Sequence, residues 1–540
     1  MPPILSEGTM SSLILFNGRI HTLNPQQPYV SALVAHGGQI VYLGDDLTAR
    51  DVLCPGKGEV VDLKSCCVLP GLNDAHLHFQ SFALGLRAVN VETPTLGEAL
   101  ARVAERVAST PAGDWVRGHG WNHNLWGGAF PTAAQLDDVA PGHPVFLSHK
   151  SGHAAWVNSR ALALARITAE TPDPPGGQIV RDAEGRPIGV LLEEAVQLVA
   201  RVIPEPTLDE VVEAIRQAVA VAHRAGLTGV HDFDGPVAFR AYQALYQRGE
   251  LTLRVTKGIP LEHLDEAVGL GLRTGFGDDW LRIGQVKMFA DGALGPRTAW
   301  MLEGYEGAPE DTGIATTEVG VLREAVFKAN RAGLACAIHA IGDRASREVL
   351  GIYAEARAQG ATGKLRNRIE HVQLLHPADV GRLAELGVIA SMQPIHATSD
   401  MLMAERHWGK ERCRYAYALK TQLKHGAVLA LGSDCPVEVI DPLLGIHAAV
   451  TRRRADGSPG PDGWHPEQRL TVEEAVRGFT WGAAYAAGLE GKLGSLQVGK
   501  LADLTILDRD IFAMDPMDIL NVRVMGTIVG GQFVWRHAEL

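Results

Sequence analysis

The middle of the chain alternates apolar strand-like runs with amphipathic helix-like stretches, and this alternation limits the fold more than any other feature. One unit reads "GLACAIHAIGD" and then "RASREVLGIYAEARAQG", and the next reads "NRIEHVQLL" and then "HPADVGRLAELG". Apolar strands separated by helices of about ten to fifteen residues are typical of parallel βαβ units. Strand-like runs start near residues 71, 115, 228, 284, 335, 368, 388 and 428. Eight such units predict an α/β fold of the (β/α)8 TIM-like barrel type, with its chemistry at the carboxyl ends of the strands.

Both ends of the chain are rich in short strands instead. Examples are "SLILFNGRIHTL" and "SALVAHGGQIVYLG" at the start and "GSLQVGKLADLTILD" and "VRVMGTIVGGQFVW" at the end, with glycine between the runs. We therefore predict that residues 1–70 and 488–540 build one composite β-sandwich domain, and that residues 71–487 form the barrel. A Pro/Gly-rich stretch, "TPDPPGGQIVRDAEGRPIGVLLEEA", indicates an insertion at about residues 110–205, in the first half of the barrel.

Composition excludes several classes of partner. The net charge is −12, so the chain has no basic surface for nucleic acid or an anionic membrane. No run of about 18 apolar residues predicts a membrane-spanning helix, and the N-terminus is a poor signal peptide. None of the six cysteines stands in a C-x-x-C pair, which favours reduced thiols and a cytoplasmic location. The expected partners are a small-molecule substrate and, by default, a second copy in a homodimer.

Six side chains that can hold a metal stand at or near the ends of predicted barrel strands. His76 and His78, in "GLNDAHLHF", are two residues apart on a strand and so point to the same face. The other four are Lys287, His339, His371 and Asp434. Each alone has an ordinary explanation, such as a structural histidine or a helix N-cap. Together they predict a site for Zn²⁺ or a similar divalent ion, because neutral imidazoles and carboxylates are its natural ligands.

Lys287 lies inside the apolar run "QVKMFADG". A buried, unpaired ammonium is costly, so this lysine must shift its pKa, be modified or extend its amine to solvent. Two metal ions about 3.5–4 Å apart need a bridging anion. A neutral lysine amine that has captured CO2 becomes a carbamate, which would supply that anion.

In combination, these motifs resemble those of the amidohydrolase superfamily over nearly the whole chain. The motifs are "FNGRIHTLNP", "LPGLNDAHLH", "GWNHNLW", "SGHAAWVNSRAL", "DPPGGQIVRD", "KMFADGALGPRTA", "HAIGD", "RIEHVQL", "GSDCPVE" and "GSLQVGKLADLTILD". The chain is similar to the YtcJ-like branch, which includes N-substituted formamide deformylases. The resemblance implies that His76 and His78 bind the more buried metal, that Lys287 bridges, that His339 and His371 bind the second metal, and that Asp434 is the remaining ligand and the general base.

The predicted activity is metal-dependent hydrolysis of a non-peptide C–N bond in an amide-like substrate, through a metal-activated hydroxide. A bound ion lowers the pKa of water to roughly 7. The predicted cofactor is a divalent metal, with zinc the expected ion, as one or two ions with a carboxylated Lys287 as the bridge. One alternative is a mononuclear, deaminase-like site that uses His76, His78, His339 and Asp434 and leaves the lysine unmodified. The other is a catalytically silent scaffold or regulatory protein, which loss of ligands would mark.

Five further residues are candidate substrate contacts. They are Trp121, His123, His153, Asp291 and Arg297. Packing within the insertion, a structural histidine and a loop salt bridge are the competing explanations. The sequence does not choose between formamides, N-acyl amino acids, cyclic amides, carbamates and esters.

Overall fold

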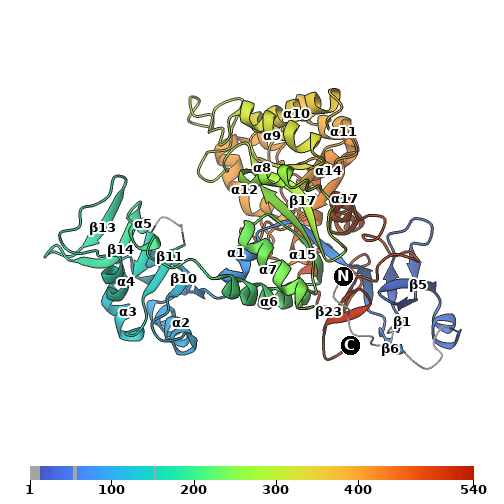
Figure 1. The fold of residues 1–540 in the computed structure, drawn as a ribbon, viewed down its shortest axis with the longest axis horizontal. Coiled ribbons are helices and arrows are strands. Elements are labelled where there is room, and N and C mark those ends of the chain that lie inside the picture. The colour runs from blue at the N-terminus through green and yellow to red at the C-terminus, as the bar shows by residue number, and fades with distance from the viewer. Residues whose placement is uncertain (1–11, 53–57, 151–153) are drawn as a thin grey trace. The chain divides into compact units, whose positions relative to one another are not determined.

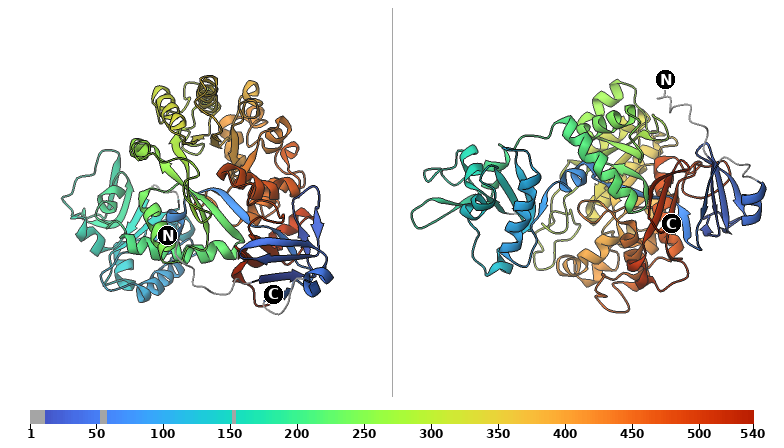
Figure 2. Two further views of the ribbon diagram at one scale, coloured as in Figure 1. Left: turned by 45° about the vertical axis from the view of Figure 1, so that its right-hand side comes forward. Right: turned by 90° about the horizontal axis from the view of Figure 1, so that it is seen from below.

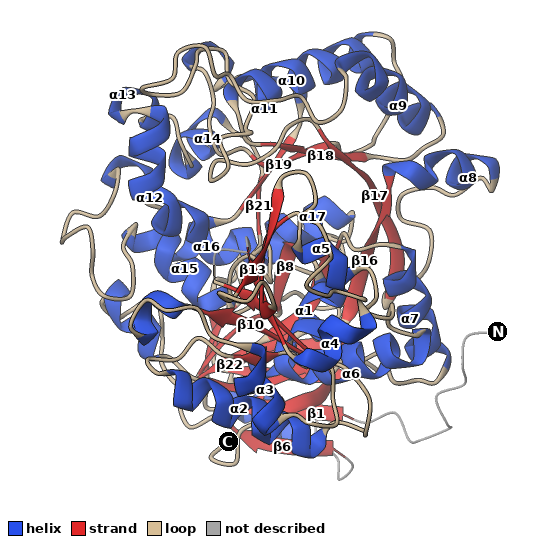
Figure 3. Ribbon diagram, turned by 90° about the vertical axis from the view of Figure 1, so that its left-hand side faces the viewer, coloured by secondary structure: helices blue, strands red, loops and turns tan. Residues whose placement is uncertain are grey.

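A sheet of eight parallel strands forms the centre of the computed structural model, which describes residues 12–52, 58–150 and 154–540. Its strand order is β21-β20-β19-β18-β17-β16-β15-β8. Figure 3 shows β16 to β19 as a curved wall with helices outside it. The strands are β8 (Leu72–Leu77), β15 (Leu227–Asp232), β16 (Arg254–Pro260), β17 (Leu281–Phe289), β18 (Cys336–Ala340), β19 (Arg368–His371), β20 (Ile389–Met392) and β21 (Leu429–Leu431). The predicted α/β barrel is confirmed.

Helices follow these strands along the chain, and most of them bury one face, whereas α15 is buried almost throughout. In α10, for example, Val349, Leu350 and Tyr353 are buried, and the Tyr353 hydroxyl donates to the carbonyl of Arg368 on β19 (3.0 Å). The helices around the barrel strands are α1 (Phe79–Gly85), α6 (Leu208–Arg224), α7 (Pro236–Gln247), α8 (Leu264–Gly269), α9 (Val319–Arg331), α10 (Asp343–Ala358), α11 (Arg382–Leu386), α12 (Pro394–Trp408), α13 (Lys410–Cys413), α14 (Leu419–His425), α15 (Pro442–Thr451), α16 (Val472–Arg477) and α17 (Ala483–Ala487).

The first and last barrel strands meet just beyond the end of β21. The Asp434 amide donates to the His76 carbonyl (2.7 Å), and the His78 amide donates to the Cys435 carbonyl (2.7 Å). Gly432 permits this approach, because a Cβ at that position would lie 2.6 Å from the His76 nitrogen. The backbone that closes the barrel therefore carries three of the predicted metal ligands.

The terminal strands build two further sheets, and one of these combines strands from both ends of the chain. In Figures 1 and 2 the blue N-terminal strands and the red C-terminal strands lie side by side. One sheet is β5-β4-β1-β6, and the other is β24-β23-β22-β7-β2-β3. Their bounds are β1 (Ser12–Phe16), β2 (Arg19–His21), β3 (Tyr29–Val30), β4 (Ala32–His36), β5 (Gln39–Gly44), β6 (Gly58–Asp62), β7 (Cys67–Pro70), β22 (Leu504–Leu507), β23 (Val524–Val529) and β24 (Gln532–Arg536). The β-domain predicted from both termini is thus part of the fold.

Residues Ala83–Ala214 form a separate compact unit. Its mixed sheet has the order β13-β14-β12-β11-β10-β9. The elements are β9 (Val89–Asn90), α2 (Leu96–Ser109), β10 (Val116–Trp121), α3 (Ala133–Val139), β11 (Val145–His149), β12 (Ala154–Val157), α4 (Ser159–Leu164), β13 (Gly177–Arg181), β14 (Pro187–Glu193) and α5 (Val196–Ala200). The exact domain boundaries that we predict from the sequence stay predictions.

One of the eight predicted barrel strands is wrong. The strand near residue 115 is β10, which pairs with β9 and β11 in the separate unit, and the barrel contains β16 instead. Because β10 runs parallel to β11, its local pattern is that of a barrel strand. In β16, Arg254 and Lys257 interrupt the apolar run, which hides a strand that is buried almost throughout.

A buried ion pair links the barrel to the terminal sheets. Arg254 on β16 contacts Asp503, which precedes β22, through Nε–Oδ2 (2.5 Å) and Nη2–Oδ1 (2.8 Å). We expect Asp503→Asn to lower the free energy of unfolding by about 3–5 kcal/mol, because it leaves a buried guanidinium without its counter-charge. Glu59→Gln, which breaks an exposed pair with Arg536, is the control and should cost less than about 1 kcal/mol. Urea denaturation checks both, and equal losses would contradict this role.

Among the described helices, none combines the length and the apolar character that a membrane span needs. The five cysteines in the described residues are all free and buried. A cytoplasmic location and a homodimer stay predictions.

Candidate metal centre

The six predicted ligands lie at or near the carboxyl ends of five of the eight barrel strands. Their positions are His76 in β8 and His78 directly after it, Lys287 in β17, His339 in β18, His371 at the end of β19, and Asp434 after β21. In a parallel barrel these ends open at the same rim, so side chains far apart in the sequence face one another.

Asp434 is the point on which three of the imidazoles converge. Its Oδ1 lies 3.4 Å from Nε2 of His76 and 3.6 Å from Nε2 of His78, and its Oδ2 lies 3.9 Å from Nδ1 of His371. The rings of His339 and His371 are 4.5 Å apart between centroids. His76, His371 and Asp434 each offer one ligand atom, and these atoms all lie within 4.8 Å of one another. All three residues are buried.

A carboxylate behind His76 fixes which of its nitrogens faces the centre. Nδ1 of His76 lies 2.5 Å from Oε2 of Glu370, which is itself paired with Arg368 (Nε–Oε1, 2.5 Å). Burial opposes the charge of Glu370, but Arg368 and Lys287 hold the pKa of this carboxyl below its usual range. A histidine that donates one N–H to a carboxylate presents its other nitrogen as a lone pair, which is the arrangement of metal-bound histidines.

His371 and His339 are oriented in the same way. Nδ1 of His371 lies 2.8 Å from Oε1 of Gln393, and Nε2 of His339 lies 2.8 Å from the Gly292 carbonyl. Burial lowers the pKa of His339 to about 3 and places the pKa of His371 well below its usual value. Both rings are therefore neutral at physiological pH, which is the form that binds a metal.

The side chains of the centre are suited to bind a cation. Nε2 of His76 is buried and has no hydrogen-bond partner within the described parts of the chain, although its ring faces the Asp434 carboxylate. An unsatisfied buried nitrogen is costly, and a metal ion shared with the carboxylate would satisfy it. The donor set of imidazole and carboxylate also suits Zn²⁺.

Lys287 is buried beside these ligands and has an unusual environment. Its Nζ lies over the rings of Phe233 (5.1 Å) and Phe289 (4.8 Å), and no carboxylate oxygen of the described residues lies within 4.0 Å of it. Burial lowers the pKa of its amine to about 8, against the opposing charges of Glu370 and Asp434. This amine is consequently neutral more readily than that of an exposed lysine.

The backbone at two of the predicted ligands is strained. His371 has φ = 76° and Asp434 has φ = 61°, in the left-handed region that non-glycine residues rarely adopt. Each such residue costs on the order of 1–3 kcal/mol, and this kind of strain clusters at functional sites. Hydrogen bonds from the closing seam hold Asp434 in this conformation.

Of the predicted substrate contacts, Asp291 is buried in the structure and Arg297 is not. Asp291 is buried, and its carboxylate accepts hydrogen bonds from the amides of Trp300, Ile341 and Gly342 (2.7–3.0 Å), so it braces the loop after β17. Arg297 is half exposed, and its Nε lies 3.8 Å from Oδ2 of Asp311. This contact is a loop salt bridge, which is the alternative to substrate binding that the sequence also allows. Direct substrate contact by either residue stays a prediction.

Trp121 and His123 belong to the separate unit. They line a cavity of about 520 Å³ there, together with Phe130 and His149. Trp121 is fully buried, and its indole N–H donates to the Leu147 carbonyl (2.9 Å). His153 lies outside the described residues. The substrate role of all three stays a prediction.

Sequence reasoning missed several polar groups that surround the ligands. The main ones are Glu370, Asp234, Gln393 and His396. Asp234 lies 3.3 Å from Nδ1 of His78; burial alone would lower the pKa of this histidine, but Asp234 outweighs it and raises the pKa. Glu370 carried a usable signal, because it is a charged residue within an otherwise apolar strand and lies two residues from Arg368.

Fold and site together define a class: a (β/α)8-barrel protein with a buried cluster of histidine and carboxylate side chains at its carboxyl rim. Residues 59–535 match the model of the amidohydrolase family. The chain belongs to this family.

Full-length relatives agree. The chain is 32% identical over 533 residues to putative amidohydrolase YtcJ of Bacillus subtilis, covering 97% of this chain and 99% of that protein. It is 30% identical over 545 residues to N-substituted formamide deformylase of Arthrobacter pascens, covering 97% and 98%. A crystal structure of an uncharacterized metal-dependent hydrolase from Pyrococcus furiosus superposes with a TM-score of 0.78 at 30% identity, covering 93% of this chain and 100% of that one.

Proposed function

We propose that this chain is a metal-dependent hydrolase that cleaves a non-peptide C–N bond in an amide-like substrate. The observation that carries the proposal is the set of imidazoles of His76, His78 and His371 around the buried Asp434 carboxylate. The similarity to N-substituted formamide deformylase supports an amide-like substrate with a small acyl group.

We assign the metal to the six residues at the barrel rim. The ligands would be His76, His78, His339, His371, Asp434 and a carboxylated Lys287 as bridge. When bound, a divalent ion supplies Lewis acidity, which ionises water and polarises a carbonyl at neutral pH.

Asp434 is the residue that we assign to proton transfer. Burial raises the pKa of its carboxyl to about 6, although His78 and Lys287 lower it. A carboxylate with a pKa near neutrality can accept a proton from the attacking water and return it to the leaving nitrogen. The water oxygen bonds to the carbonyl carbon, the C–N bond breaks, and a carboxylic acid and an amine leave.

The test is a substrate screen on the zinc-loaded protein. We expect hydrolysis of at least one member of a panel of N-formyl, N-acyl and cyclic amides. Removal of metal by a chelator should abolish this activity, and added Zn²⁺ should restore it. No turnover of any amide by a fully loaded protein, or activity that survives complete metal removal, would refute the proposal.

Carboxylation of Lys287 has its own test. The neutral amine would attack CO2 and lose its N–H proton to solvent, and the carbamate anion would then be available as a metal ligand. We therefore expect two metal ions at the barrel rim of each chain, and Lys287→Ala should lower the metal content by at least one ion per chain. Native mass spectrometry and elemental analysis measure the mass of the modification and the loss of metal, with exposed Lys328→Ala as the control. A single ion at the barrel rim and an unmodified lysine would favour the mononuclear arrangement.

A further inference from the structure

A second cluster of metal-binding side chains lies away from the barrel rim, in the sheet built from both termini. His21 ends β2 and Cys67 begins β7, and these strands pair in parallel with Arg19 opposite Cys67. Because side chains alternate along a strand, His21 and Cys67 lie on the same face. Asp510 follows β22, whose Leu507 pairs with Cys67. The three residues therefore come from three separate segments.

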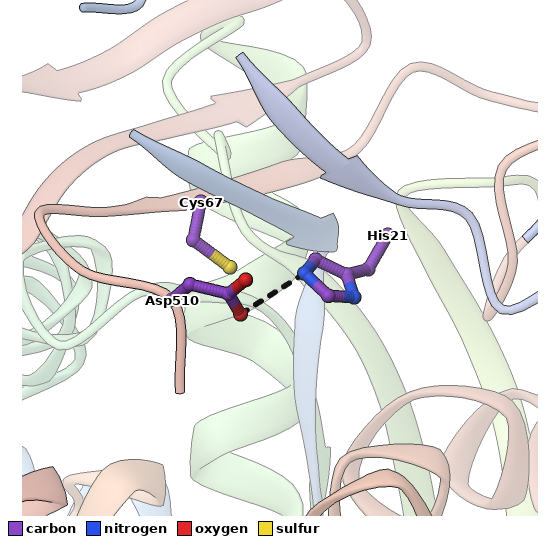
Figure 4. A group of neighbouring side chains, drawn as sticks. All are labelled: His21, Cys67 and Asp510. Atoms are coloured by element: carbon purple, nitrogen blue, oxygen red, sulfur yellow. Dashed lines mark ion pairs between the residues drawn. The ribbon is translucent and has the colours of Figure 1, made fainter. Parts of the chain in front are cut away.

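The three side chains point toward one another (Figure 4). Nε2 of His21 lies 3.0 Å from Oδ1 of Asp510, and the sulfur of Cys67 completes a set whose ligand atoms all lie within 4.8 Å of one another. His21 and Cys67 are buried, at 4% and 0% exposure, and the Asp510 side chain is 14% exposed. The cluster is thus nearly closed, with one side accessible to a water ligand.

His21 carries a nitrogen that nothing in the described chain satisfies. Its Nε2 is buried and makes no hydrogen bond, since the short contact with Asp510 lacks hydrogen-bond geometry. Aromatic rings fix its direction: it stacks on Phe512 (4.0 Å between centroids) and meets Tyr29 edge-on (4.9 Å). Packing therefore holds the His21 ring so that a nitrogen without a hydrogen bond points at a thiol and a carboxylate. This is the arrangement expected of a metal ligand.

The chemistry of the three groups matches one class of ion. Imidazole nitrogen, cysteine sulfur and carboxylate oxygen are all ligand atoms for Zn²⁺. Burial raises the pKa of the Cys67 thiol, so a bound ion must displace its proton. A thiolate and a carboxylate neutralise a divalent charge, and sulfur with imidazole suits Zn²⁺ or Co²⁺ rather than Mg²⁺ or Ca²⁺. Arg19, 3.7 Å from Asp510, is 61% exposed and can turn into solvent.

We propose that His21, Cys67 and Asp510 bind a divalent transition-metal ion, with zinc the best match, that ties the N-terminal strands to the C-terminal segment. On binding, the Cys67 thiol loses its proton to solvent and a thiolate–metal bond forms. The ion is independent of the barrel centre, whose proposed ligands include no sulfur.

Cobalt distinguishes the two centres, because only a thiolate ligand gives a sulfur-to-cobalt charge-transfer band in the near ultraviolet. We expect the full-length protein titrated with Co²⁺ to develop this band. Cys67→Ser should abolish it and should remove one metal ion per chain by elemental analysis. Asp510→Asn should weaken cobalt binding at this site at least tenfold.

Cys66→Ser is the matched control. Cys66 is the neighbouring residue and is buried, but it packs into the apolar core of the terminal sheets, so this variant should keep the band. Circular dichroism verifies that each variant is folded. No band in the wild-type protein, or a band that survives in folded Cys67→Ser, would overturn the proposal.

Discussion

Replacing Asp434 with asparagine should lower kcat/KM by about 10³-fold, the largest loss of activity that we expect from a single isosteric change. The amide has nearly the shape of the carboxylate, so it can keep the contacts of the barrel seam. The asparagine amide cannot accept the proton of the attacking water. Because the carboxylate charge is lost, His76 and His78 then face a neutral group. Steady-state kinetics on an amide found in the substrate screen measures the effect.

Metal analysis of the same variant separates two roles of Asp434. Four imidazoles remain in Asp434→Asn, so most of the metal should stay bound, and the loss should fall on kcat rather than on metal content. Asp462→Asn, on an exposed loop, controls for the effect of removing a carboxylate elsewhere. A fully active variant would contradict the proton-transfer role, and a variant without metal would reassign Asp434 mainly to metal binding.

The barrel could be predicted because its pattern is local. Strands such as β18 are short apolar runs followed by an amphipathic helix, and this alternation is visible without any knowledge of contacts. The candidate ligands could be located for the same reason, since each one stands at the end of a recognisable strand; that they bind a metal stays a prediction. Parallel topology alone then brings the strand ends to a single rim.

The errors have one physical cause, which is that long-range partners are invisible in the sequence. The sequence does not predict β16, because Arg254 and Lys257 interrupt its apolar pattern. In the structure the charge of Arg254 is compensated by Asp503. The charge of Lys257 is compensated by backbone carbonyls and by Asp232 at 3.6 Å. β10 was misassigned because a parallel strand has the same pattern in any sheet. The cluster around His21 was missed because its three members meet only once both termini share a sheet.

Glu370→Gln should produce the second large effect, on metal binding and on stability together. Glu370 is fully buried and joins His76 to Arg368. Glutamine keeps the shape but removes the charge that orients the imidazole, so metal affinity should fall by about 10–100-fold. It also leaves the buried guanidinium without its counter-charge, which should lower the free energy of unfolding by about 3–5 kcal/mol.

Two measurements on this variant keep these consequences apart. Competition with a chelator gives the metal affinity of the folded protein, and urea denaturation of the metal-free protein gives the stability. Glu385→Gln, in α11 and exposed, should change neither. If the metal-free variant were destabilised while its metal affinity stayed within twofold of the wild type, Glu370 would serve only to compensate Arg368. A loss in both would mean that the same carboxylate stabilises the barrel interior and orients a ligand at its rim, so the centre could not change its ligand geometry without a cost in stability.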